Sequence, residues 1–173
     1  MPKKAQLEHA VHEAEIDGLN QSAFLVLRRF RIVFNAVKTH FREVEKKAGL
    51  AGAQVWALSV VRDHPGIGVS GLARAMDIHQ STASNLLKSL LEQGMVAADR
   101  TGADRRAVQL HVSAKGLKIL KKAPGPFTGV LPEALVKLDA ATLKRLDRDL
   151  AKLIRLLGGD QRGATIPLGQ PDQ

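Results

Sequence analysis

Apolar residues between Val69 and Leu91 fall into two sets with helical spacing, separated by a short polar turn. The first set runs from Val69 to Met76 and the second from Ala83 to Leu91, and in each set they recur at steps of three or four. Asp77 lies between them, and Asp tolerates the left-handed backbone conformation that a sharp turn requires. This pattern predicts a helix-turn-helix, whose second helix enters the major groove of DNA.

A short hairpin is predicted directly after the second helix. Gly94 occupies the usual position of a helix-ending glycine, residues 95–98 are predicted as a short strand, and residues 107–112 alternate as expected for its partner strand. The connector, residues 99–106, is too polar to pack. A charged connector by itself is typical of a solvated turn, but after a helix-turn-helix it indicates the wing of a winged helix.

Three arginines of this connector are candidates for contact with DNA. Arg100, Arg105 and Arg106 suit insertion into a narrow minor groove, where the negative potential is strongest. Asp104 lies beside two of them, and a bidentate bond from this carboxylate would orient one guanidinium.

Two apolar seams with alternating steps of three and four flank the predicted head. One runs from Phe24 to Val44 and ends before the glycines of 49–52; a short helix over 53–63 follows it. The other follows a helix cap at Asp139. Each seam could be intramolecular core, but two of them exceed what one small domain needs to cover itself. We therefore expect both chain ends to form a dimerisation platform through Leu27, Phe30, Leu143, Leu146, Leu150, Leu153 and Leu157.

The predicted fold class is mainly α with a small β-wing, a winged helix-turn-helix head on an α-helical dimerisation platform. The predicted parts are a partly helical N-terminal extension, the platform in two pieces, the head and a disordered tail. Residues 123–129 contain two prolines and two glycines and cannot continue a helix. A plain loop is favoured there, with a kink or a hinge as alternatives. The boundaries are 1–22 for the extension, 23–48 and 117–157 for the platform, 49–116 for the head and 158–173 for the tail.

Composition limits the classes of binding partner and the cellular compartment that we expect. The net charge of +9 favours a polyanionic partner, although residues 70–110 carry five basic against four acidic side chains. The absence of cysteine excludes disulfides, cysteine-based zinc sites and a thiol switch. No apolar run reaches the length of a signal peptide or a membrane helix, so we expect a cytoplasmic protein with no membrane partner.

The residues from Asp104 to Gly116 resemble a known family pattern. They are DRRAVQLHVSAKG, and the wing of the MarR (multiple antibiotic resistance regulator) family has Asp-x-Arg, an apolar strand and Leu-Thr-x-x-Gly. Here Val112-Ser113 replaces Leu-Thr and keeps a hydroxyl to cap the next helix. The resemblance covers about Phe24 to Leu157 and implies a symmetric winged-helix dimer, usually a repressor released by a small ligand or by oxidation. The break at 123–129 departs from the family, in which a long helix often runs through this region.

The outward side of the predicted second helix supplies the candidate DNA contacts. If this helix begins near Gln80, its outward residues have amide, hydroxyl and ammonium groups. Amides and hydroxyls can bond base edges, whereas an ammonium suits a phosphate or a guanine. Helix capping is the alternative for the first residues, and we expect one of 80–82 to cap as well. The candidates are Gln80, Ser81, Thr82, Ser84, Asn85 and Lys88.

An effector site follows from the resemblance alone, which places it between the head and the platform. Phe34, Lys38, Phe41 and Trp56 are the candidate residues, and a small aromatic acid would suit them. Plain core packing is the favoured alternative for these side chains.

Two further motifs are weaker. Residues 66–71 match the dinucleotide pattern GxGxxG, but a proline precedes them and the next helix is short. His9 and His12 could share a helical face, yet surface histidines are the favoured interpretation, and we predict no metal and no cofactor. No nucleophile elbow, HExxH motif or phosphate loop is present, so no enzyme is predicted.

These features predict a sequence-specific transcriptional regulator, a repressor that binds pseudo-palindromic double-stranded DNA as a homodimer and is released by a small molecule. A ligand-independent architectural or protein-docking winged-helix dimer is the alternative. Specific binding that a small molecule relieves would separate the two.

Overall fold

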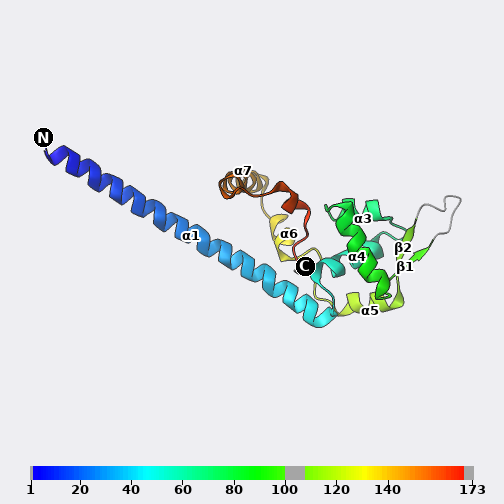
Figure 1. The fold of residues 1–173 in the computed structure, drawn as a ribbon. Helices are drawn as coiled ribbons and strands as arrows, with labels where there is room; N and C mark the ends of the chain where they lie inside the picture. Colours follow the sequence, from blue (N-terminus) through cyan, green and yellow to red (C-terminus); the bar gives the residue numbers. More distant parts are fainter. Residues whose placement is uncertain (1, 100–107, 170–173) are drawn as a thin grey trace. The chain divides into compact units, whose positions relative to one another are not determined.

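The computed structural model describes the backbone of residues 2–99 and 108–169 (Figure 1). It describes the side chains of 18–99, 108–160 and 163–169. Two compact units are present, Met1–Val37 and Lys38–Gln173. Helix α1 (Pro2–Ala48) runs from the first unit into the second, and the boundary predicted at residue 22 stays a prediction.

The first unit is the N-terminal part of α1, and its apolar residues are largely exposed. Phe24 is 69% exposed and Phe34 is 65% exposed. The rings of Phe30 and Phe34 stack at 6.0 Å between centroids, as residues four apart on a helix can. The apolar seam predicted from the sequence is therefore present, but this unit does not bury it.

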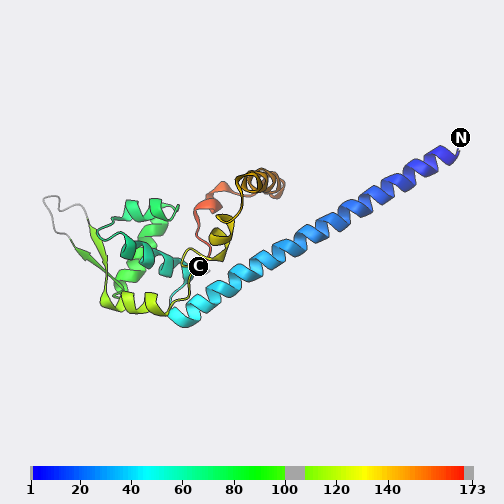
Figure 2. The ribbon, with the colours of Figure 1, turned by 180° about the vertical axis from the view of Figure 1, so that it is seen from behind.

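The second unit contains the winged helix. Its elements after the end of α1 are α2 (Gly52–Asp63), α3 (Val69–Ala75), α4 (Gln80–Glu92), β1 (Val96–Asp99), β2 (Gln109–Val112), α5 (Ala114–Lys122), α6 (Val130–Leu135), α7 (Ala140–Leu157) and the 3₁₀ helix η1 (Gln161–Thr165). Figure 2 shows the same elements from behind, with the hairpin leading into α5. This element order confirms the predicted mainly helical fold with a small β-wing.

The core of the second unit lies where α2, α3, α4 and the hairpin meet. Leu58, Leu72, Leu90 and Leu110 are each at most 1% exposed, and Val44 from the end of α1 joins them. The antiparallel hairpin pairs residue 96 with 112 and residue 99 with 109. A bridge from residue 67 to Leu110 extends the pairing to the segment before α3. The apolar sets at helical spacing thus supply the core that fixes the two helices.

Local backbone features confirm the predicted turn chemistry. Asp77 has a φ of 52°, the left-handed conformation expected at the turn between α3 and α4. Gly94 has a φ of 68° directly after α4. The Ser113 hydroxyl accepts a hydrogen bond from the Gly116 N–H at 3.1 Å and so caps α5. The Asp139 carboxylate caps α7 by accepting from the Thr142 N–H at 2.9 Å.

The connection between the head and α7 is broken, as predicted. Helix α5 ends at Lys122, residues 123–129 form an irregular segment, and the short helix α6 follows. The His40 imidazole lies 3.1 Å from the carbonyl oxygen of Pro126, which ties this segment to α1. A hinge there stays a prediction.

Residues 158–169 differ from the predicted disordered tail. After Gly158 they form η1, and Pro167 is buried. The Ala53 N–H donates a hydrogen bond to the Gly169 carbonyl oxygen at 3.3 Å. The polar, glycine-rich composition predicts disorder, but docking beside the start of α2 gives this segment the burial that its own sequence could not supply.

Candidate nucleic-acid interface

Helix α4 separates its apolar and polar side chains onto two faces. Ala83, Leu86, Leu87 and Leu90 are buried against the other helices. The opposite face presents the predicted contact residues: Gln80, Ser81, Ser84, Asn85 and Lys88 are exposed, and Thr82 is half-buried. The buried leucines fix the rotation of α4, so the outward direction of these polar groups follows from the core.

The start of α4 corrects one expectation about capping. His79 occupies the cap position, and its side chain makes no cap hydrogen bond. The helix therefore does not use a hydroxyl or amide of residues 80–82 as its cap. The Ser84 hydroxyl instead donates to the Gln80 carbonyl oxygen at 2.8 Å. The lone pairs of Ser84 remain able to accept a hydrogen bond from a base.

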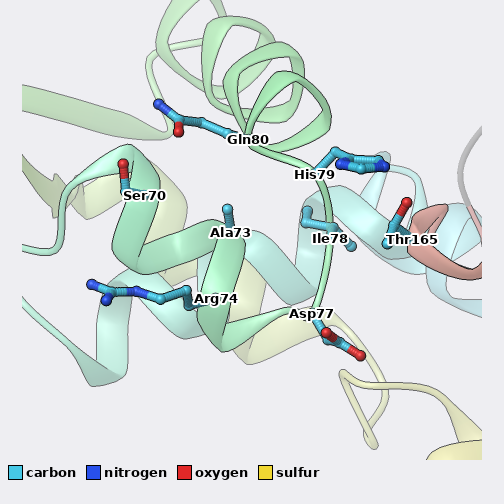
Figure 3. Close-up of a pocket in the computed structure, with 8 residues that line it drawn as sticks. All are labelled: Ser70, Ala73, Arg74, Asp77, Ile78, His79, Gln80 and Thr165. Atoms are coloured by element: carbon cyan, nitrogen blue, oxygen red, sulfur yellow. The ribbon is translucent and has the colours of Figure 1, made fainter. Parts of the chain in front are cut away.

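A hollow of about 450 Å³ lies between α3 and the start of α4 (Figure 3). Ser70 and Arg74 of α3 extend toward the same side of the view as Gln80, whereas Asp77 and Thr165 lie on the other side. Sequence analysis did not select Ser70 and Arg74. Their exposed positions four residues apart on α3 were the available signal, because the first helix of a helix-turn-helix crosses the DNA backbone.

A second hollow, of about 400 Å³, joins α4 to the wing strands. Ser84 and Lys88 of α4 line it together with Ala98 of β1 and Val108, which directly precedes β2. The outward residues of the helix and the base of the hairpin therefore border one surface. The wing residues predicted to contact DNA, Arg100, Asp104, Arg105 and Arg106, lie outside the described residues.

The residues predicted to form an effector pocket are distributed over both units. Phe34 belongs to the first unit and Lys38, Phe41 and Trp56 to the second. The Phe41 ring packs directly against Gly52, and the half-buried Trp56 packs against the core of the second unit. These contacts favour core packing for Phe41 and Trp56, and an effector role for the four residues stays a prediction.

One ion pair at the end of α2 has a clear electrostatic effect. Arg62 donates hydrogen bonds of 2.7 and 3.0 Å to the Asp63 carboxylate. These hydrogen bonds lower the pKa of Asp63 below its ordinary value. The Arg62 guanidinium also lies 5.5 Å from the centroid of the Phe127 ring, which connects α2 to the segment before α6.

Neither a metal site nor a membrane-spanning helix is present among the residues that the structure describes. Among those residues, no group of three or more His, Asp or Glu side chains is placed to hold a metal ion. The described helices are each too short or too polar to cross a membrane.

Comparison with known proteins relates part of the chain to one family. Residues 48–107 match the model of the MarR family. The chain is 29% identical over 157 residues to a Thauera aromatica protein described as a transcriptional regulatory protein for the hcr operon, a match that covers 90% of this chain and 86% of that protein. It is 24% identical over 84 residues to the HTH-type transcriptional repressor MdtR of Bacillus subtilis, covering 49% of this chain and 54% of MdtR.

Solved structures share the fold. Streptococcus pneumoniae FabT, solved in complex with DNA, matches with a TM-score of 0.50 at 17% identity, over 78% of this chain and 95% of FabT. The YusO protein of Bacillus subtilis matches with a TM-score of 0.50 at 19% identity, over 79% of this chain and 96% of YusO. The helix-turn-helix geometry, the match of residues 48–107 to the MarR family and the relatives, which are described as transcriptional regulators, agree with one another.

Proposed function

We propose that this protein is a repressor that binds pseudo-palindromic operators as a homodimer and leaves them when a small molecule binds. The observation that carries DNA recognition is the outward face of α4. There, exposed amide, hydroxyl and ammonium groups stand on a helix whose other face is anchored in the core. Groups of this kind recognise base edges and phosphates, and a fixed helix presents them in one register.

The exposed seam of α7 supports dimerisation. Leu146 is 39% exposed and Leu150 40%, and none of the α7 residues is buried. A helix with one apolar face gains stability when that face packs against another surface. A second copy would cover the seam, and two recognition helices could then read half-sites about one turn of DNA apart.

Repression is supported by a relative, since MdtR is named as a transcriptional repressor. Streptococcus pneumoniae FabT, with the same fold, was solved in complex with DNA, which supports a duplex as the partner. Release by a small molecule follows from the family resemblance, with an aromatic acid as the proposed effector class.

The first experiment is selection of bound fragments from genomic DNA at two salt concentrations. A two-fold symmetric site that stays enriched at the higher salt is the expected result. Binding that ignores sequence and collapses at high salt would contradict the proposal, because phosphate contacts alone behave in that way. The protein would then be an architectural DNA binder.

A pair of glutamine variants tests the reading face, by which we mean the outward side of α4 that carries Gln80, Ser84, Asn85 and Lys88. Gln80→Ala, at the start of the helix, should weaken binding to the selected duplex about tenfold and relax preference at one base position. Gln93→Ala removes the same amide just after the end of the helix and should leave the affinity unchanged. Asn85→Ala and Ser84→Ala should also change base preference. Equal effects of the two glutamine variants would contradict the assignment of the reading face.

The wing and the effector need separate tests. Arg105→Ala or Arg106→Ala should weaken binding to most sequences alike, since minor-groove arginines respond mainly to groove shape.

Benzoate is the probe for the proposed effector site. It should change both Trp56 fluorescence and the affinity for the selected duplex, and no change in either would remove the aromatic-acid proposal.

A further inference from the structure

The chain returns from the end of α7 to the head through residues 158–169. Gly158 ends α7 in the left-handed conformation, with a φ of 62°. Internal hydrogen bonds then shape the return, because the N–H of Gly163 donates to the Asp160 carbonyl and the N–H of Ile166 donates to the Gly163 carbonyl. Pro167 is buried, while its neighbour Leu168 is 53% exposed. We call residues 161–169 the return segment.

The return segment docks at Gly169 beside the start of α2. Its carbonyl oxygen accepts the 3.3 Å hydrogen bond from the Ala53 N–H, and its φ is 82°. A Cβ added at Gly169 would lie 2.6 Å from the nearest atoms of the Phe41 ring. A side chain at this position would therefore collide with the ring and strain the backbone.

The Phe41 side chain connects four parts of the second unit by packing. It belongs to the last turns of α1, and its ring lies against Gly52 at the start of α2, Gly129 before α6 and Gly169 of the return segment. A Cβ at Gly129 would lie 3.2 Å from the ring. Three separate segments approach one ring through glycine. If one of these segments moves, the ring must shift, and its packing against the other two segments changes.

The return segment also reaches the helix-turn-helix. Thr165 lines the hollow beside the turn, where Ile78 and His79 lead into α4 (Figure 3). The segment therefore meets the head at the start of α2, through the Gly169 hydrogen bond, and it borders the hollow beside the turn before the recognition helix through Thr165. Since no residue of α7 is buried, the packing of α7 itself does little to hold it on the head.

We infer that the return segment positions the recognition helix relative to α7, with Gly169 and Pro167 as positioning residues for DNA binding. This inference rests on the proposed function, because the platform helix α7 sets the distance between two heads only in an operator-binding dimer. With the segment docked, α7 is linked to the head at both of its ends and cannot rotate freely. With the segment undocked, each head would tolerate a wider range of half-site spacings.

The test compares Gly169→Ala with Gly163→Ala in the full chain. A Cβ at Gly163 meets nothing within 4 Å, so the same change there is a matched control. Hydrogen exchange of the Ala53 amide reports docking without DNA, and it should become about tenfold faster in Gly169→Ala. Affinity is then measured on the selected duplex and on duplexes whose half-sites are moved apart by one or two base pairs.

The expected result is a loss of spacing discrimination. Gly169→Ala should bind the original duplex about threefold to tenfold more weakly and the shifted duplexes almost as well as the original one. A variant that was merely less stable would lose affinity equally at all spacings. Pro167→Ala, compared with Leu168→Ala, repeats the test if Gly169→Ala does not fold, which circular dichroism would show.

Three outcomes would overturn the inference. Unchanged exchange at Ala53 would mean that Gly169 does not hold the docked state. Faster exchange with unchanged spacing discrimination would mean that docking does not position the head. An equal loss of affinity at all half-site spacings would mean that the return segment only stabilises the fold. Failure of the proposed function is recognised separately, because the wild-type protein would then select no two-fold symmetric site.

Discussion

Helices α4 and α7 have the same kind of amphipathic pattern, yet they stand in opposite environments. In α4, Leu86, Leu87 and Leu90 are at most 5% exposed. In α7, Leu146 and Leu150 are 39% and 40% exposed, and none of the residues is buried. An apolar repeat therefore shows that a helix has a face to cover, while the fold decides whether the same chain covers it.

The chain buries the apolar face of α4 by itself, whereas it leaves the apolar face of α7 exposed. The head has its own core, so the orientation of α4 within the head is fixed by the buried leucines. Helix α7 presents its apolar seam outward, and covering that seam would contribute about 25 cal/mol for each Å² of apolar surface removed from water. The following predictions test this contrast, from the largest expected effect to the smallest.

Leu90→Ala should destabilise the chain by about 2–5 kcal/mol, because it removes a fully buried side chain and leaves a cavity. Urea unfolding followed by circular dichroism at fixed protein concentration measures the change. Leu91→Ala is the control on the next residue, which is 37% exposed, and it should cost less than about 1 kcal/mol. Similar losses for both variants would contradict the buried face assigned to α4.

Leu150→Glu should weaken the proposed dimer about 100-fold, because a charge would replace an apolar side chain in the covered seam. Sedimentation equilibrium measures the dissociation constant. Leu156→Glu is the matched control, since Leu156 is 86% exposed and lies outside the seam. A dimer that tolerates Leu150→Glu as well as Leu156→Glu would exclude α7 from the interface.

Ser113→Ala should cost about 1 kcal/mol of the free energy of unfolding. The Ser113 hydroxyl accepts from the Gly116 N–H and donates to the Gly94 carbonyl oxygen at 2.7 Å, so it joins the start of α5 to the end of α4. Asp139→Ala removes the corresponding cap of α7 and should change stability less, because Asp139 holds only its own helix. Thermal unfolding of both variants checks this order.

Asp63→Asn should have the smallest effect, about 0.5 kcal/mol or less at neutral pH, because the pair with Arg62 is exposed. Hydrogen bonds from Arg62 lower the pKa of Asp63 in the folded state. The stabilisation is therefore present above the unfolded-state pKa and disappears as the pH falls below about 4, through the folded-state pKa. The difference in stability between wild type and variant should therefore be smaller at pH 3 than at pH 7, as unfolding curves at the two pH values would show.

Much of the head could be predicted from the sequence because its signals are local. The spacing of apolar residues gave the limits of α3 and α4 closely, and Asp77 and Gly94 marked the turns at which the backbone becomes left-handed. The hydroxyl of Ser113 and the carboxylate of Asp139 predicted two helix starts. Each signal involves residues within a few positions, where backbone geometry is set by neighbouring side chains.

The candidate site was less predictable where it depends on distant segments. The outward residues of α4 followed from its periodicity, but Ser70, Arg74 and Thr165 share a hollow with Gln80 only because separate segments meet there. The composition of residues 158–169 also led to a wrong prediction of disorder. Their order depends on the burial of Pro167 and on the hydrogen bond from Ala53 to Gly169, and no local rule reports such a docking site.

The sequence by itself determined the two helices and the turn of the helix-turn-helix, the hairpin and the residues that α4 turns outward, because these depend on short-range periodicity and backbone preference. Only the tertiary structure decided which apolar faces are buried. It also showed that Phe41 packs against glycines from three segments and that the chain returns to the head after α7. Burial and docking are long-range properties, and the free energy that fixes them comes from surfaces that are far apart in the chain.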